Sequence, residues 1–188
     1  MAYFPVFVDM SELRVLLVGG GTIAKEKLEK LLDFTENISI ISLEVNEEMM
    51  KLIHAHGLTL YQKAYETKES AAYDIVIVAT NTQALHKEIY DETRGTRTLV
   101  NSVDNTAFCD FIFPSYVQKG ELTVAFSTGG ASPAFAKKLR QYFEKSIPNS
   151  VESFLEEMKE LRKSMPKGRS RMVYFERLVE TYFSKYFQ

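Results

Sequence analysis

The segment from Gly19 to Ala24 reads Gly-Gly-Gly-Thr-Ile-Ala and directly follows the apolar run 14–18. It matches the spacing G-x-G-x-x-A, in which Gly19 permits a tight turn and Gly21 lets the backbone approach a pyrophosphate. The small side chain of Ala24 allows a helix to pack closely on a strand. The first N–H groups of that helix would bind anionic oxygens. The turn therefore predicts a dinucleotide site, and an empty strand-to-helix turn is the alternative.

A dinucleotide site usually has an acidic residue at the end of the second strand, where it accepts hydrogen bonds from the adenosine ribose. In this chain Ser42 occupies the usual position, and Glu44 lies two residues later. Glu44 could still accept from the ribose hydroxyls, or it could be a helix-capping or solvated acid before Asn46. Because no arginine follows to bind a 2′-phosphate, the sequence favours NAD over NADP.

Polar residues also follow two later strand-like runs, at Ala79-Thr80-Asn81 and at Val103-Asp104-Asn105. Ligands of parallel α/β sheets bind at the carboxyl ends of strands, so both segments would border the crevice. Asp104 could act there as a general base or hold a substrate N–H or a metal ion, although an Asx turn is favoured when these residues are considered alone. A second glycine turn, Ser127–Pro133, could bind a carboxylate or phosphate, or could simply begin a capped helix.

Other reactive residue types are weaker candidates. The three histidines lack the spacing of paired metal ligands, so no metal site is predicted, and the single cysteine, Cys109, is expected to be a packed thiol. A basic stretch near the C-terminus is either a solvated loop or a contact for an acidic substrate; it comprises Lys163, Lys167, Arg169 and Arg171.

The segments that must position these residues alternate between strand and helix patterns. Apolar runs predict strands at 14–18, 37–43, 58–61, 74–79 and 99–103, and helical periodicity predicts helices at 24–34, 46–56 and 82–91. This order predicts a parallel sheet with right-handed crossovers. Later, a hairpin is expected from strands 111–117 and 121–127. A helix should start at Ser132-Pro133 and end near 145, followed by amphipathic helices at 151–165 and 172–187.

Composition limits the class of protein. A chain of 188 residues with 45% hydrophobic and 26% charged residues is globular, and its net charge of −2 argues against non-specific nucleic-acid binding. The longest apolar runs are too short to cross a bilayer, and the N-terminus lacks the features of a signal peptide. We therefore expect a cytoplasmic protein without a nucleic-acid or membrane partner.

Together and in this order, the motifs resemble the siroheme synthase N-terminal family, the precorrin-2 dehydrogenase and sirohydrochlorin ferrochelatase enzymes. The resemblance covers residues 3–145, and its combination of motifs is more specific than any one of them. The segments that carry it are Phe4–Val8, Val18–Ala24 with Lys27, Ala79–Asn81, Asp104 with Phe111–Ser115, and Ser127–Pro133.

The resemblance implies NAD-dependent oxidation of precorrin-2 to sirohydrochlorin, and many members then insert Fe²⁺ as a further substrate. It implies that Asp104 is the catalytic residue. With the glycine motif, it assigns cofactor binding to Gly19, Gly20, Gly21, Thr22, Ile23, Leu43, Glu44, Ala79, Thr80 and Asn81. The substrate-binding residues expected from the second glycine turn are Thr128, Gly129 and Ser132.

The expected fold class is α/β: a Rossmann-like NAD-binding domain over 1–112, a β-hairpin and helix dimerisation segment over 113–147, and a helical C-terminal domain over 148–188. The resemblance implies an interlocked homodimer that holds the tetrapyrrole between the nucleotide domain and the helices of the partner. Two alternatives remain. One is an NAD-sensing regulatory module of the potassium-transport type, which leaves Asp104 and the second glycine turn without a role. The other is a different small NAD-dependent dehydrogenase.

Overall fold

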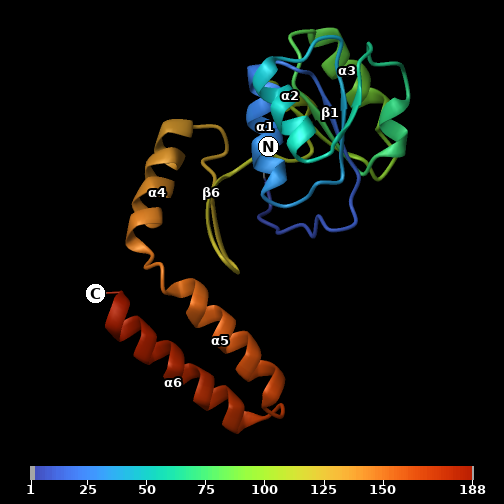
Figure 1. The fold of residues 1–188 in the computed structure, drawn as a ribbon. Helices are drawn as coiled ribbons and strands as arrows, with labels where there is room; N and C mark the ends of the chain where they lie inside the picture. The colour runs from blue at the N-terminus through green and yellow to red at the C-terminus, as the bar shows by residue number, and fades with distance from the viewer. Residues whose placement is uncertain (1–2, 188) are drawn as a thin grey trace. The chain divides into compact units, whose positions relative to one another are not determined.

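The computed structural model describes residues 3–187. By its internal contacts the chain divides into two compact units, Tyr3–Ile112 and the residues from Phe113 onward. Figure 1 shows strands and helices interleaved in the first unit, and a hairpin followed by helices in the second.

The first unit is built on a parallel five-stranded sheet with the order β3-β2-β1-β4-β5. Every residue of β1 and of β4 is buried, because helices cover both faces of the sheet and leave no strand face for polar side chains. The predicted parallel α/β sheet is confirmed. The strands are β1 Val15–Val18, β2 Ile38–Ile41, β3 Thr59–Tyr61, β4 Ile75–Val78 and β5 Leu99–Ser102.

Three α-helices pack on this sheet, α1 Thr22–Leu32, α2 Glu47–Ala55 and α3 Gln83–Glu92, and two 3₁₀ turns, η1 Glu69–Ala72 and η2 Thr106–Phe108, complete the unit. In Figure 1, α1 and α2 lie on one side of the sheet and α3 on the other. This follows from right-handed crossovers, since the chain runs outward from β1 to β3 and then returns to continue from β4 to β5. The direction of winding therefore reverses between β1 and β4, where such sheets bind ligands.

The register of the sheet brings the strand ends level. Val18 pairs with both Ile41 and Val78, and Val78 pairs with Ser102. The residues that follow β1, β2, β4 and β5 therefore emerge at one edge. The buried apolar residues beneath this edge, such as Leu16 and Val76, form the core that fixes it.

The second unit contains an antiparallel hairpin, β6 Ser115–Lys119 and β7 Leu122–Phe126, and three helices. The helices are α4 Pro133–Ser146, α5 Val151–Ser164 and α6 Arg169–Tyr186. Val117, Ile147, Val151 and Tyr182 form its core, and the rings of Phe154 and Tyr182 stack with their centroids 4.1 Å apart. In Figure 1, α5 and α6 run side by side in opposite directions.

Three predicted features in this region have wrong boundaries: the first hairpin strand, the hairpin turn and the last helix. The strand expected at 111–117 begins only at Ser115, because Phe111 belongs to the first unit, where its carbonyl accepts a 2.8 Å hydrogen bond from the Asn101 side chain. The hairpin turn consists of Gly120 and Glu121 alone, and the positive φ of Gly120 (+55°) suits the first central position of a type II′ turn. The last helix starts at 169, three residues before the predicted 172. The prediction missed the first turn because that turn is polar and has no apolar residues at helical spacing.

No helix in the described part of the chain combines the length and apolar character needed to cross a bilayer.

Candidate active site

The glycine turn after β1 fits closely between two neighbouring segments. Gly19 has a φ of +129°, and a Cβ there would lie 2.2 Å from the carbonyl oxygen of Ala79. A Cβ on Gly20 would lie 2.0 Å from the carbonyl oxygen of Glu44. A Cβ on Gly21, in contrast, would meet no atom within 4 Å. The first two glycines therefore allow the backbones after β4 and β2 to pack closely against the turn. The third faces open space in which a ligand could lie.

Helix α1 starts at this turn with its first N–H groups available for a ligand. Within the described chain, no side chain caps the helix at Gly21, and the first turn carries no acidic residue. Thr22 is exposed, Ile23 is 43% exposed, and Ala24 is buried beneath them. An uncapped helix start beside an open glycine is the arrangement that binds a pyrophosphate, so these residues fit a dinucleotide.

The loop after β2 is tied to the glycine turn. The backbone N–H of Asn46 donates to the carbonyl of Gly20 at 2.9 Å, and the Asn46 side chain caps α2 by accepting from Met49 at 2.8 Å. The Ser42 hydroxyl donates to the carbonyl of Glu44 at 2.7 Å. Asn46 therefore caps α2 in place of Glu44, and the side chain of Glu44 is exposed at the edge of the site. Leu43 beside it is 66% exposed and offers an apolar surface.

The segments after β4 and β5 complete the edge. Ala79 donates its N–H to the carbonyl of Val18 at 2.8 Å, and Val103 donates to Val78 at 2.9 Å. Asp104 follows with an exposed side chain and a φ of +61°, in the left-handed region that residues other than glycine seldom enter. The sheet therefore brings Gly19–Ile23, Leu43-Glu44, Ala79–Asn81 and Asp104 to one edge.

A lysine of α1 acts electrostatically on Asp104. Burial lowers the pKa of Lys27, the neighbouring Lys30 lowers it further, and the carboxylate of Asp104 opposes this shift. A partly buried lysine of α1 therefore lies within electrostatic range of Asp104. The family motif contains Lys27, but its place in the sequence indicates no role for it.

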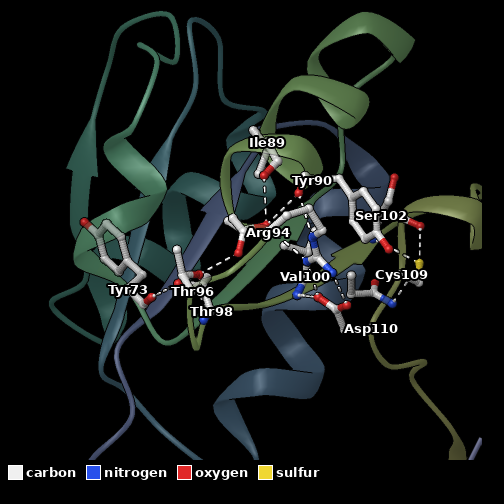
Figure 2. Close-up of polar contacts among 12 residues, drawn as sticks. Tyr73, Ile89, Tyr90, Arg94, Thr96, Thr98, Val100, Ser102, Cys109 and Asp110 are labelled. Carbon is white, nitrogen blue, oxygen red and sulfur yellow. Dashed lines mark hydrogen bonds and ion pairs between the residues drawn. The ribbon is translucent and has the colours of Figure 1, made fainter.

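Cys109 lies below this edge, and burial raises the pKa of its thiol. It is therefore a protonated, packed thiol rather than a nucleophile. Figure 2 shows Cys109 beside Ser102, and Arg94 bound to Asp110 through both arms of its guanidinium group, each at 2.7 Å. These contacts join the segment after β5 to the end of α3. Within residues 3–187, no cluster of three or more His, Cys, Asp or Glu side chains could hold a metal ion.

The sequence reasoning missed His86 as a site residue. Its side chain is 1% exposed and bridges the segments after β4 and in β5 through Thr80 and Ser102. The spacing Leu85, His86, Ile89 placed it near the buried face of α3, but periodicity alone could not name its polar partners.

The second glycine turn lies in the other unit and is organised by its own hydroxyls. Thr128 Oγ1 accepts from the N–H of Ser132 at 3.0 Å, and Ser132 Oγ caps α4 by accepting from Phe135 at 3.2 Å. Gly129 and Gly130 have φ values of +60° and +88°. The predicted start of this helix is confirmed, while substrate binding by Thr128, Gly129 and Ser132 stays a prediction.

The reversal of winding between β1 and β4, the uncapped helix start and the exposed acid after β2 define a dinucleotide-binding protein of the Rossmann-like class. A family model of NAD(P)-binding domains matches residues 6–115, and a model of the central part of sirohaem biosynthesis proteins matches residues 119–146. The chain belongs to the siroheme synthase N-terminal family, as its sequence motifs predicted.

Similar proteins agree with this assignment. A siroheme synthase of Pseudoalteromonas atlantica is 37% identical over 80% of this chain and 33% of its own length. A siroheme synthase of Methylococcus capsulatus is 33% identical over 96% of this chain and 39% of its own length. The chain thus spans well under half the length of these relatives. The solved structure of SirC, a precorrin-2 dehydrogenase, matches with a TM-score of 0.80 and 25% identity over 98% of this chain and 91% of that one. None of these matches supports the potassium-transport alternative.

Proposed function

We propose that this chain is a precorrin-2 dehydrogenase that oxidises precorrin-2 to sirohydrochlorin with NAD⁺. The observation that carries the proposal is the placement of Asp104 at the same sheet edge as the open glycine turn, in a fold that matches SirC over nearly its whole length. A nucleotide-sensing module would need the glycine turn but has no use for an exposed carboxylate beside it.

In this proposal the cofactor is held by the backbone of the glycine turn, with Glu44 accepting hydrogen bonds from the ribose hydroxyls. Leu43 lies along the adenosine, and Ala79, Thr80 and Asn81 border the dinucleotide. When bound, NAD⁺ supplies the acceptor for a hydride, so the substrate gives up one hydride and one proton. The carboxylate of Asp104 accepts the proton, and the side chain of Lys27 lies within electrostatic range of that carboxylate. The protein thus contributes mainly position and one base.

The second unit would bind the tetrapyrrole and join two copies of the chain. We assign 113–147 to dimerisation and 148–188 to a helical domain. Within the described chain the hairpin has only two strands, so both of its edges are open to pairing with a partner. Thr128, Gly129, Ser132 and the exposed Lys167 and Arg169 provide hydroxyl, N–H and cationic groups for the carboxylates of the substrate. Size-exclusion chromatography with light scattering should give the mass of two chains.

The test is anaerobic incubation of the purified protein with precorrin-2 and NAD⁺. We expect NADH and the absorption spectrum of sirohydrochlorin to appear together. Protein that binds NAD⁺ but forms no NADH would overturn the enzyme assignment. A parallel assay with sirohydrochlorin and Fe²⁺ measures the iron insertion that the family resemblance implies.

A cytoplasmic location is part of the proposal, because the only cysteine is a free, buried thiol, as suits a reducing compartment.

A further inference from the structure

The imidazole of His86 lies between two strand ends that border the candidate site. Its Nε2 lies 2.9 Å from the carbonyl oxygen of Thr80, and its Nδ1 contacts the hydroxyl of Ser102. Because a carbonyl only accepts, Nε2 carries a proton, and in the neutral ring Nδ1 accepts from the Ser102 hydroxyl. One buried ring therefore joins the segment after β4 to the last residue of β5.

Ser102 is held from a second side by Cys109. The thiol sulfur accepts from the N–H of Ser102 at 3.2 Å, and the thiol donates to the Ser102 carbonyl at 3.1 Å (Figure 2). Two residues later the backbone enters the left-handed conformation of Asp104. A residue other than glycine keeps such a conformation only where surrounding contacts enforce it. The contacts with His86 and Cys109 thus hold Ser102 in place, and the position of Ser102 determines where the turn places Asp104.

We propose that His86 is a positioning residue for both halves of the site: through Thr80 it holds the segment that borders the cofactor, and through Ser102 it holds Asp104. The inference rests on the proposed function for the roles of these two partners. His86 is too deeply buried to touch substrate, so it acts only through them. One imidazole then sets the spacing between the hydride-accepting and proton-accepting sides of the reaction.

The two hydrogen bonds can be removed separately, because an amide side chain can replace either ring nitrogen. In His86→Asn the amide oxygen takes the place of Nδ1 and keeps the bond from Ser102, but the side chain is too short for Thr80. In His86→Gln the terminal amide takes the place of Nε2 and keeps the bond to Thr80, but offers no acceptor to Ser102.

We expect opposite kinetic effects from the two variants. His86→Asn should weaken NAD⁺ binding about tenfold and leave kcat at saturating NAD⁺ within about threefold, because only the cofactor side is loosened. His86→Gln should lower kcat about tenfold and leave the Kd for NAD⁺ within about threefold, because only Asp104 is loosened. Thr93→Val is the matched control. It removes a buried hydroxyl that donates to the carbonyls of Ile89 and Tyr90 on α3 and accepts from Arg94, so it should lower stability without changing either kinetic quantity.

A histidine that only fills the core would give a different result. If both variants keep the parent's kcat and Kd, or lose both in equal proportion, the proposal is overturned. Calorimetry of NAD⁺ binding does not depend on the substrate, so it tests the Thr80 link even if the parent fails to oxidise precorrin-2. In that case the amide NMR signals of residues 103–105 test the Ser102 link. They should shift in His86→Gln and not in His86→Asn, and the reverse pattern would contradict the proposal.

Discussion

At the scale of single residues, Asp104 combines an exposed carboxylate with a backbone conformation that few residue types accept. Aspartate and asparagine enter the left-handed region more readily than other residues with a side chain, apart from glycine. The chain therefore places a carboxylate at a sharp turn after β5 with less backbone strain than most other side chains would cause there. Its exposure leaves the carboxylate accessible to a substrate that lies over the sheet edge.

The role of this carboxylate can be tested without disturbing its turn. Asp104→Asn keeps the size of the side chain and tolerates the same φ, but it cannot accept a proton. We expect kcat for precorrin-2 oxidation to fall about 10²–10⁴-fold, with the melting temperature and the Kd for NAD⁺ unchanged. Steady-state kinetics, calorimetry and thermal unfolding measure the three quantities. Unchanged turnover would show that another group takes the proton, while leaving the family assignment intact.

The glycine turn allows packing and cofactor binding to be separated by two neighbouring substitutions. In Gly20→Ala the new Cβ would collide with the carbonyl of Glu44, so the free energy of unfolding should fall by about 1–3 kcal/mol. In Gly21→Ala the new Cβ meets only open space, so the unfolding free energy should change by less than about 1 kcal/mol. The methyl group would nevertheless occupy the place of the pyrophosphate and weaken NAD⁺ binding at least about tenfold. Urea unfolding and calorimetry separate the two effects, and NAD⁺ binding unchanged in Gly21→Ala would contradict the placement of the cofactor.

At the scale of elements, the segment after β5 folds back along its own strand. The Asp110 N–H donates to the carbonyl of Val100 at 2.8 Å, and the Asp110 carboxylate accepts from the Val100 N–H at 2.9 Å. The guanidinium group of Arg94, bound to the same carboxylate, lies 3.8 Å from the ring centre of Tyr90. One carboxylate thus joins the segment after η2 to β5 and to the end of α3.

This ion pair should make folding sensitive to acid. The hydrogen bond from Arg94 is the largest influence that holds the pKa of Asp110 below its usual 3.8, ahead of the opposing effect of burial. A carboxyl group with a lowered pKa in the folded state contributes stability above pH 3.8 and loses it as the pH falls through the folded value. Asp110→Asn can still accept from Val100 but does not titrate. We expect it to be about 1–3 kcal/mol less stable at neutral pH and to show a shallower loss of stability in acid. Urea unfolding across this pH range is the measurement, and parallel acid slopes for parent and variant would refute the assignment.

The elements that the sequence predicted well were those with a strong apolar pattern. β1 and β4 are continuous apolar runs, and α1 buries Ala24, Leu28 and Leu31 at helical spacing. The run 111–114 was misread as strand because it is equally apolar, although its backbone bonds to an asparagine of β5. The turns η1 and η2 were missed because such short elements carry no periodicity.

The candidate site could be predicted in part for the same reason. Strand ends are visible in the sequence, and parallel pairing brings them together, so the residues at the sheet edge were identifiable in advance. The contacts that support them were not. His86 lies 16 residues before Ser102, Cys109 lies seven residues after it, and the contacts among them form only in the folded structure. Residues that bind a ligand can leave a motif, whereas residues that position them generally do not.

At the scale of the whole molecule, the two units have separate cores of unequal strength. The first is built on strands whose side chains are almost fully buried, such as Leu16 and Val78. The second depends on a smaller cluster around Val117 and Tyr182. The candidate cofactor residues lie in the first unit alone. Binding of NAD⁺ should therefore stabilise the first unit and not the second, although both belong to one chain.

Calorimetric unfolding with and without NAD⁺ tests this separation. A ligand that binds only the folded first unit stabilises it by about 2.7 kcal/mol at a free concentration of 100 times its Kd. We expect two transitions, of which the one for Tyr3–Ile112 moves to higher temperature with NAD⁺ while the other stays in place. Gly21→Ala serves as the control, because its weaker binding should reduce the shift of the first transition to about half or less at the same NAD⁺ concentration. A single transition that moves as a whole would show that the units unfold cooperatively. Movement of the second transition alone would place the cofactor outside the glycine turn.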